Sequence, residues 1–349
     1  MFRWGLLGMS FALGACGFTP PVIHDARPAD AAIDSVDAPP GACDLPALSL
    51  KVATLTGCAD GGTDDGPRGE AHFSNPVNLV LSASGIAYVA DFDSRRLRKV
   101  EPSGKTTTLV ELPHPFGMAI APDGYLIVET DDDDMGQHSF ASGTVWRVNP
   151  ATGAATVIVR DIGRPRGIEV LPDGRIALTD QVHHVVELLD PATGIVSVIA
   201  GTADAMGHVN GSGAAARFSQ PWDVVYWNGD LIVSEVDNGD LRRVTLAGVV
   251  SDVVPPGTFD QPQGIAVDAS GTIYVTEYGN ARDVRKVVGS TATLLAGSTA
   301  GYTDSDTPTA AQFYGVEGID VTPDGSRLVV ADGNHGDGMP FNHIREIHQ

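Results

Sequence analysis

The strongest constraint on this sequence is an internal repeat that recurs six times. The copies begin at Pro76, Pro115, Pro165, Pro221, Pro262 and Val316. Two residues after each of these positions stands a glycine or, in two copies, Asn78 or Asp223. An apolar segment, a turn glycine and further short apolar segments follow, with turn signals roughly every 8–12 residues. Repeated units of four short strands are typical of a β-propeller, and the absence of a sustained helical period disfavours a helical solenoid.

The two ends of the repeat region complement each other. The last copy stops in its third segment, at residues 343–349, whereas residues 51–57 resemble the fourth segment at residues 292–297. Pairing of the N-terminal strand with the C-terminal blade would remove two exposed sheet edges. The sequence therefore predicts an all-β, six-bladed propeller over residues 48–349, closed by its N-terminal strand.

The repeat resembles a known family. The run Phe218-Ser219-Gln220-Pro221 and residues 264–277 resemble NHL repeats, and the linking segments at residues 200–218 and 296–313 are similar to the loops between blades in that family. The resemblance covers about residues 50–349. It implies the six-bladed fold and leaves function open, because such propellers serve as binding platforms, sensor domains and, in relatives, enzymes.

The N-terminus has the pattern of an export signal. Arg3 precedes an apolar run that ends in Leu13-Gly14-Ala15-Cys16, and this run is too short to span a bilayer. It resembles the signal of bacterial lipoproteins, which implies a signal peptide over residues 1–15 and lipidation of Cys16. The expected location is the outer membrane, the cell surface or the periplasm, with an ordinary cleaved signal peptide as the alternative. Residues 16–47 are rich in Pro, Ala and Asp and are expected to form a disordered tether.

Two cysteines remain, Cys43 and Cys58. An exported protein meets an oxidising environment, so we expect a disulfide between them, with two free thiols as the alternative. The bridge would tie the end of the tether to the propeller and contribute about 2–4 kcal/mol.

The composition restricts the partners. A formal net charge of −22 excludes a general nucleic-acid binder, because the chain could not neutralise a run of phosphates. It also disfavours electrostatic docking on anionic lipid, which leaves the lipid anchor as the expected membrane contact. We expect a monomer.

An acid recurs after the second segment of each copy and is expected on the side of the ring where the innermost strands begin, here called the upper face. These acids are Asp91, Asp131, Asp180, Glu235, Glu277 and Asp332. They are candidates for binding a cationic ligand. The alternative is structural, with each acid meeting an arginine of the third strand (Arg96, Arg147, Arg242, Arg282 or Arg345). Loops at residues 131–138 and 333–339 bring His138 and His335 to the same face as further candidates.

Three residues interrupt the repeat near the axis: Asn78, Asp223 and Glu317. Three converging oxygen ligands could bind Ca²⁺. Similar axial sets occur in propellers resembling gluconolactonase/regucalcin and paraoxonase, which makes a Ca²⁺-dependent hydrolase or lactonase the alternative function, and a lyase with a histidine-bound metal a third. The preferred interpretation is a non-catalytic domain that binds a protein, peptide or glycan on its upper face, with no certain cofactor.

Overall fold

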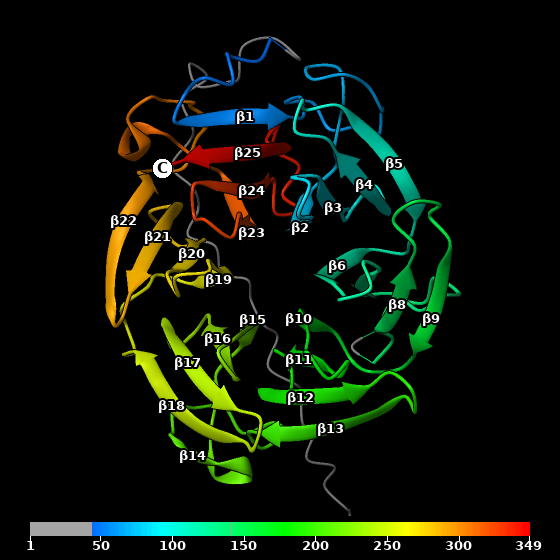
Figure 1. The fold of residues 1–349 in the computed structure, drawn as a ribbon, viewed down its shortest axis with the longest axis vertical. Helices are drawn as coiled ribbons and strands as arrows, with labels where there is room; N and C mark the ends of the chain where they lie inside the picture. Colours follow the sequence, from blue (N-terminus) through cyan, green and yellow to red (C-terminus); the bar gives the residue numbers. More distant parts are fainter. Residues whose placement is uncertain (1–43, 140) are drawn as a thin grey trace, which may run out of the picture. The chain divides into compact units, whose positions relative to one another are not determined.

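The structure is a computed structural model that describes residues 44–139 and 141–349 as six antiparallel sheets around a central axis (Figure 1). The six-bladed all-β fold is confirmed. The signal peptide, Cys16, Cys43 and most of the tether lie outside the described residues, so lipidation, the disulfide and the domain boundaries stay predictions.

The blades follow one another along the chain, each running from an inner to an outer strand. Blade 1 consists of β2 (Pro76–Leu81), β3 (Ala87–Asp91), β4 (Arg96–Val100) and β5 (Thr106–Glu111). Blade 2 consists of β6 (Pro115–Ile120), β7 (Leu126–Thr130), β8 (Thr144–Val148) and β9 (Ala155–Val159). Blade 3 consists of β10 (Pro165–Val170), β11 (Ile176–Asp180), β12 (Val185–Asp190) and β13 (Ile195–Ala200). Blade 4 consists of β15 (Pro221–Trp227), β16 (Asp230–Glu235), β17 (Asp240–Thr245) and β18 (Val249–Val254), with the short β14 (Gly211–Ser212) at its outer edge. Blade 5 consists of β19 (Pro262–Val267), β20 (Ile273–Glu277), β21 (Asp283–Val288) and β22 (Thr291–Gly297).

Blade 6 joins the two ends of the described chain. It contains β23 (Gly315–Val321), β24 (Arg327–Gly333), β25 (His343–His348) and, on the outside, β1 (Val52–Thr56). β1 pairs antiparallel with β25, with Val52 opposite Ile347 and Thr54 opposite Arg345. The prediction that the N-terminal strand closes the ring is therefore confirmed, and Figure 1 shows the two strands side by side.

The Pro-x-Gly pattern sets the geometry of the inner strands. Proline is the first residue of five inner strands, a position at which its missing N–H costs no ladder hydrogen bond. In each of these strands the register with the second strand shifts just after the proline, as between Pro76 and Asn78. The bulge lets the first residues of each inner strand approach the axis.

The core lies between the blades. Six apolar clusters each join two neighbouring sheets, as where Ala119 and Ile127 of blade 2 meet Ile168 and Leu178 of blade 3. Every sheet is thus buried on both faces except at its outer strand. Two short 3-10 helices, η1 (Gly213–Ala215) and η2 (Pro308–Ala310), lie in the loops between blades. No helix among the residues described is long and apolar enough to cross a membrane.

Candidate functional site

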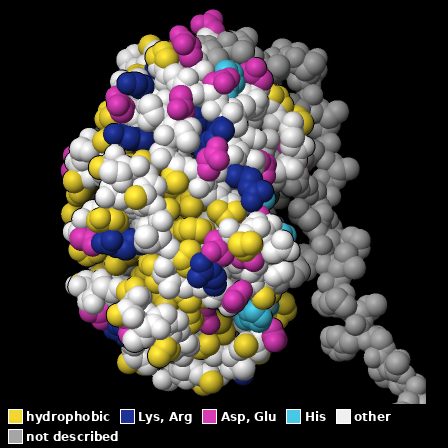
Figure 2. Space-filling view, turned by 90° about the vertical axis from the view of Figure 1, so that its right-hand side faces the viewer, with side chains coloured by type: hydrophobic (Ala, Val, Ile, Leu, Met, Phe, Trp, Pro, Cys, Tyr) yellow, Lys and Arg dark blue, Asp and Glu magenta, His cyan; other side chains and the backbone are white. Residues whose placement is uncertain are grey.

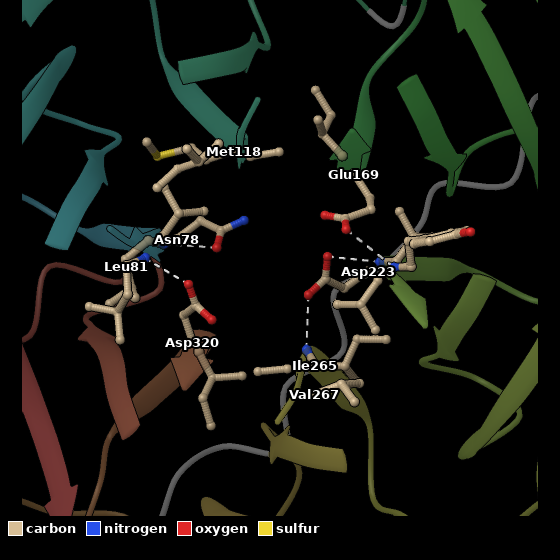
Figure 3. Close-up of a pocket in the computed structure, with 18 residues that line it drawn as sticks. Asn78, Leu81, Met118, Glu169, Asp223, Ile265, Val267 and Asp320 are labelled. Atoms are coloured by element: carbon tan, nitrogen blue, oxygen red, sulfur yellow. Dashed lines mark hydrogen bonds between the residues drawn. The ribbon is translucent and has the colours of Figure 1, made fainter. Parts of the chain in front are cut away.

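A cavity of about 240 Å³ lies on the axis and is lined by the inner strands of all six blades (Figure 3). Four of its residues carry polar side chains that converge from opposite sides: Asn78, Glu169, Asp223 and Asp320. The other lining residues are mainly aliphatic.

The four polar residues form a pseudo-twofold arrangement. Asn78 of blade 1 and Asp223 of blade 4 occupy the repeat glycine position of opposed blades. Glu169 of blade 3 and Asp320 of blade 6 occupy the position two residues further along, again in opposed blades. Since residues two apart in a strand point to the same side, both pairs face the axis.

Each axial carboxylate also joins its blade to the next one. The backbone N–H of Leu81 donates to Asp320 Oδ2 at 2.6 Å, and that of Ile265 donates to Asp223 Oδ2 at 2.9 Å. Tyr226 N–H donates to Glu169 Oε1 at the longer distance of 3.3 Å. The carboxylates thus hold neighbouring inner strands together at the axis.

Burial disfavours the charged form of the three axial carboxyl groups. It raises the pKa of Asp320 to about 6, that of Asp223 to about 7 and that of Glu169 to about 8. The charge of Asp320 adds to the shift at both Asp223 and Glu169, whereas backbone N–H donors partly oppose it. A cation bound between these groups would remove the repulsion.

Glu317, the third residue predicted near the axis, does not line this cavity. Its Oε1 lies 3.1 Å from His335 Nε2 on the upper side. Burial raises the pKa of Glu317 to about 8, although the nearby guanidinium of Arg166 favours the charged form. The structure therefore brings Asn78 and Asp223 together with Glu169 and Asp320 rather than with Glu317.

Above the cavity, side chains from the starts of the inner strands and from the loops after the second strands form what we call the channel mouth. It comprises Phe92, Phe116, Arg166, Trp222, Gln263, Tyr278, Glu317 and His335. These two groups of positions meet because the start of each inner strand pairs with the end of the second strand, as Pro76 does with Asp91.

One side of the channel mouth is aromatic. Phe116 and Trp222 have ring centroids 5.9 Å apart, and the Arg166 guanidinium lies over both rings, at 4.1 and 5.6 Å. Phe92 continues the row, with its centroid 6.1 Å from that of Phe116. Phe92 and Trp222 are half-buried, so part of each ring is open to solvent.

The other side is polar. His335 stacks on Tyr278 with ring centroids 3.8 Å apart, and its Nε2 lies 3.5 Å from Gln263 Nε2. Arg282 lies over Tyr278 at 3.9 Å. The channel mouth thus combines flat apolar surfaces with charged and hydrogen-bonding groups.

Most of the recurring acids are structural in their contacts. Asp91, Glu235, Glu277 and Asp332 are buried and bind arginines of the third strand: Arg98 at 3.0 Å, Arg242 at 2.8 Å, Arg285 at 2.5 Å and Arg345 at 3.0 Å. The expected partners Arg242 and Arg345 are correct. Arg96, Arg147 and Arg282 were wrong, because Arg96 faces Glu111, Arg147 pairs with Asp123, and Arg282 lies in the loop before β21.

The two remaining acids sit in blades that lack this arginine. Trp146 and Glu187 occupy the equivalent third positions of β8 and β12. Asp131 instead binds Arg164 and Arg166 of the next blade, the latter at 2.8 Å, and Asp180 binds His183 at 2.6 Å. Blades 2 and 3 therefore depart from the structural pattern beside the aromatic side of the channel mouth.

The predicted histidines both lie on the upper side. His335 belongs to the channel mouth, and His138 lies 2.6 Å from Asp132 in the loop of blade 2. Glu169, Asp320, Phe92, Arg166, Trp222 and Tyr278 had not been singled out. A signal existed for Glu169 and Asp320, because the other four copies have Val or Ala at the same repeat position. The positions of Phe92, Arg166, Trp222 and Tyr278 vary among all the copies and carried no such signal.

On the side of the ring near β5 and β9, the outer surface does not separate charges of opposite sign. Figure 2, a view of the side of the ring near β5 and β9, shows acidic and basic side chains interspersed. Ion pairs on the surface of the described residues include Arg147 with Asp123 and Arg160 with Asp134.

Comparisons with known proteins agree with this fold. Residues 259–282 match the family described as NHL repeat. Over 176 residues the chain is 27% identical to Protein SUPPRESSOR OF QUENCHING 1, chloroplastic, of Arabidopsis thaliana; the match covers 50% of this chain and 14% of that protein.

Two solved structures share the architecture at low identity. An auxiliary nutrient binding protein from Bacteroides ovatus has a TM-score of 0.63 and 16% identity, with 85% of this chain and 76% of that chain covered. A gluconolactonase from Xanthomonas campestris has a TM-score of 0.57 and 15% identity, with coverages of 85% and 89%. At such identities the likeness is one of fold alone. The blade count and the structural comparisons together identify this chain as a six-bladed β-propeller, in which one segment, residues 259–282, matches the NHL repeat.

Proposed function

We propose that this chain is a non-catalytic binding propeller whose ligand site is the channel mouth on the upper face. The observation that carries the proposal is the row of aromatic rings formed by Phe92, Phe116 and Trp222. Arg166 lies over two of these rings, and the polar pair of Glu317 and His335 lies on the other side of the channel mouth. A few oriented polar groups beside aromatic surfaces are the usual composition of a ligand site.

The ligand class follows from this chemistry. A ligand with a flat apolar face and several hydroxyl or amide groups, such as an oligosaccharide or a peptide, suits the channel mouth. The fold shared with a nutrient binding protein is in keeping with this class. The recurring acids would not contribute directly, because most of them are held by buried arginines.

Trp222→Ala tests the proposal. Binding of a panel of oligosaccharides and peptides to the full chain would be measured by calorimetry. For any ligand found, we expect Trp222→Ala to weaken binding by more than about tenfold, since buried aromatic anchors dominate binding energy.

Tyr125→Ala is a matched control, because Tyr125 also stacks with an arginine, Arg147, at 3.4 Å, but in the turn between β6 and β7 at the opposite end of the inner strands. Equal affinities of the wild type and Trp222→Ala would place the binding site elsewhere.

We further propose that the propeller is displayed on a lipid anchor at Cys16, in the outer membrane, on the cell surface or in the periplasm. Replacement of Cys16 by serine should move the protein from the membrane fraction to the soluble fraction, as measured by fractionation and immunoblotting. Unchanged membrane partitioning of Cys16→Ser would exclude this anchor.

A Ca²⁺-dependent hydrolase or lactonase is the second candidate function. It is favoured by the convergence of Asn78, Glu169, Asp223 and Asp320 on one cavity, because carboxylate and amide oxygens are the ligands that Ca²⁺ takes. The raised pKa values of Asp223 and Glu169 fit a site that lacks positive charge of its own.

A further inference from the structure

A separate cluster of ligating side chains lies on the upper side of blade 2, at His114, Asp132 and His138. Two of the three come from the long connection between β7 and β8. This connection folds back on itself: Asp132 and His138 form an isolated β-bridge, and Gly136 N–H donates to the carbonyl of Asp133 at 2.9 Å. The hairpin therefore sets Asp132 and His138 opposite each other.

His114 approaches the same point from the segment before β6. Its backbone has the left-handed φ of 52°, and its carbonyl accepts a hydrogen bond from the N–H of Asp131 at 3.0 Å. The residue is thus tied to the base of the hairpin, and its side chain is presented to Asp132 before any ligand binds.

The three side chains meet around one carboxylate. Asp132 Oδ2 lies 2.9 Å from His114 Nδ1, and Asp132 Oδ1 lies 2.6 Å from His138 Nδ1. One ligating atom from each residue lies within 4.8 Å of the other two. The Asp132 side chain is 3% exposed and those of His114 and His138 are 27% and 54% exposed, so the carboxylate forms the floor and the imidazoles form the rim.

The charged side chains around Asp132 are compatible with a bound cation. Arg95 lies 3.4 Å from Asp132 Oδ2, but its side chain is 48% exposed and can turn into solvent. Asp93 lies near enough to interact electrostatically with His114. Asp133 is half-buried, and its Oδ1 accepts hydrogen bonds from the backbone N–H groups of Met135 and Gln137. Asp134 pairs with Arg160.

A second cluster shows what distinguishes this one. His208, Asp240 and Asp252 also lie within 4.8 Å of one another. There, however, the wholly buried Arg242 lies 3.1 Å from Asp252, so a fixed guanidinium already supplies the positive charge and has no route to solvent.

We propose that His114, Asp132 and His138 bind a late first-row divalent metal ion, with Zn²⁺ as the expected occupant. Two imidazoles and one carboxylate suit zinc, whereas Ca²⁺ and Mg²⁺ prefer oxygen ligands alone. Three protein ligands leave one tetrahedral position for water or for a donor atom of a ligand. His114 lies beside Phe92 of the channel mouth, with ring centroids 4.9 Å apart, so such a ligand would meet both sites.

The experiment is a titration of the full chain, freed of metal with a chelator and dialysed, with ZnCl₂ by calorimetry. Co²⁺ serves as a spectroscopic probe of the coordination geometry. We expect one Zn²⁺ per chain in the wild type and a Co²⁺ spectrum of low coordination number. His114→Gln and His138→Gln should each lower the affinity by more than about 100-fold, beyond what loss of a supporting outer residue costs.

His183→Gln is the matched control, because His183 also bonds an aspartate through Nδ1, at 2.6 Å, but belongs to no group of three ligating side chains among the residues that the structure describes. It should bind Zn²⁺ as the wild type does, and circular dichroism should show all variants folded. Absence of stoichiometric binding in the wild type, or equal affinities of the wild type and both glutamine variants, would overturn the proposal. Neither result bears on Trp222→Ala, so the zinc site and the ligand site are tested independently.

Discussion

Arg345→Met is expected to destabilise the propeller by about 3–5 kcal/mol, because it leaves buried carboxylates without their cation. Arg345 is fully buried and binds Asp332 Oδ2 at 3.0 Å and Asp304 Oδ1 at 2.6 Å. Asp304 Oδ2 also accepts the backbone N–H of Thr54 in β1, at 2.9 Å. The substitution therefore weakens the contacts of the strand that closes the ring. Urea unfolding followed by circular dichroism measures the loss.

Two further variants test whether the loss of stability comes from the buried ion pairs of Arg345. Arg147→Met removes an ion pair of similar length, 2.6 Å, whose partners are 39% and 55% exposed, and should cost less than about 1 kcal/mol. Adding Asp304→Asn and Asp332→Asn to Arg345→Met should restore part of the stability, because no buried charge is then left unpaired. If Arg345→Met costs no more than Arg147→Met, the buried arginine does not hold the closing blade.

The second large effect concerns the axial carboxyls and pH. The folded-state pKa values of Asp223 and Glu169, about 7 and 8, lie above their ordinary values of 3.8 and 4.5. The folded protein therefore holds protons that the unfolded chain has released. The stability due to these groups is fully present below about pH 4 and is lost as the pH rises through about 8.

Glu169→Gln isolates this effect. The amide resembles the protonated carboxyl, so the variant and the wild type should be about equally stable at low pH. Above pH 8 the variant should be more stable by up to about 5 kcal/mol, since the pKa of Glu169 rises from 4.5 to about 8 and each unit of pKa shift corresponds to about 1.4 kcal/mol. Thermal or urea unfolding over a pH series measures the difference. Asp306→Asn, at an exposed acid, should show no such pH-dependent difference. A difference between Glu169→Gln and the wild type that does not change with pH would contradict the assignment.

The same variants test the second candidate function. If Ca²⁺ binds in the axial cavity, millimolar CaCl₂ should stabilise the wild type at pH 8, because ligand binding to the folded state raises stability by mass action. The stabilisation should be lost in the double variant Glu169→Gln/Asp223→Asn and kept in Asp306→Asn. A wild type whose melting temperature does not respond to Ca²⁺ or to chelator would remove the Ca²⁺-dependent hydrolase from consideration.

The repeat predicted the six-bladed fold well because each copy contains the residues that start its inner strand and form its bulge and its turn. Proline at the start of five inner strands, the residue two positions later and the turn glycine recur in a fixed order, and they correspond to strand start, bulge and hairpin. The closing role of residues 52–56 was also predictable, because a blade lacking its outer strand and an unpaired strand of matching pattern are complementary.

The arginine partners show where this reasoning was incomplete. The paired arginines are the third residues of their strands, and Arg98, Arg242, Arg285 and Arg345 lie opposite Val89, Val233, Val275 and Val330. Arg96 and Arg98 have the same strand parity, so alternation alone does not separate them. The cross-strand register even sets Arg96 directly opposite Asp91, and only the tertiary structure shows that Arg98, two residues further along, makes the buried ion pair.

By itself, the sequence determined the all-β repeat, the number of blades, the closing strand and the positions of Asn78 and Asp223 near the axis. The tertiary structure alone decided that Glu169 and Asp320 share their cavity while Glu317 faces His335, and that His114 reaches the hairpin of blade 2. The physical reason is that strand patterns depend on neighbours along the chain. The meeting of side chains from opposed blades depends on how six sheets close into a ring, and no local pattern records that geometry.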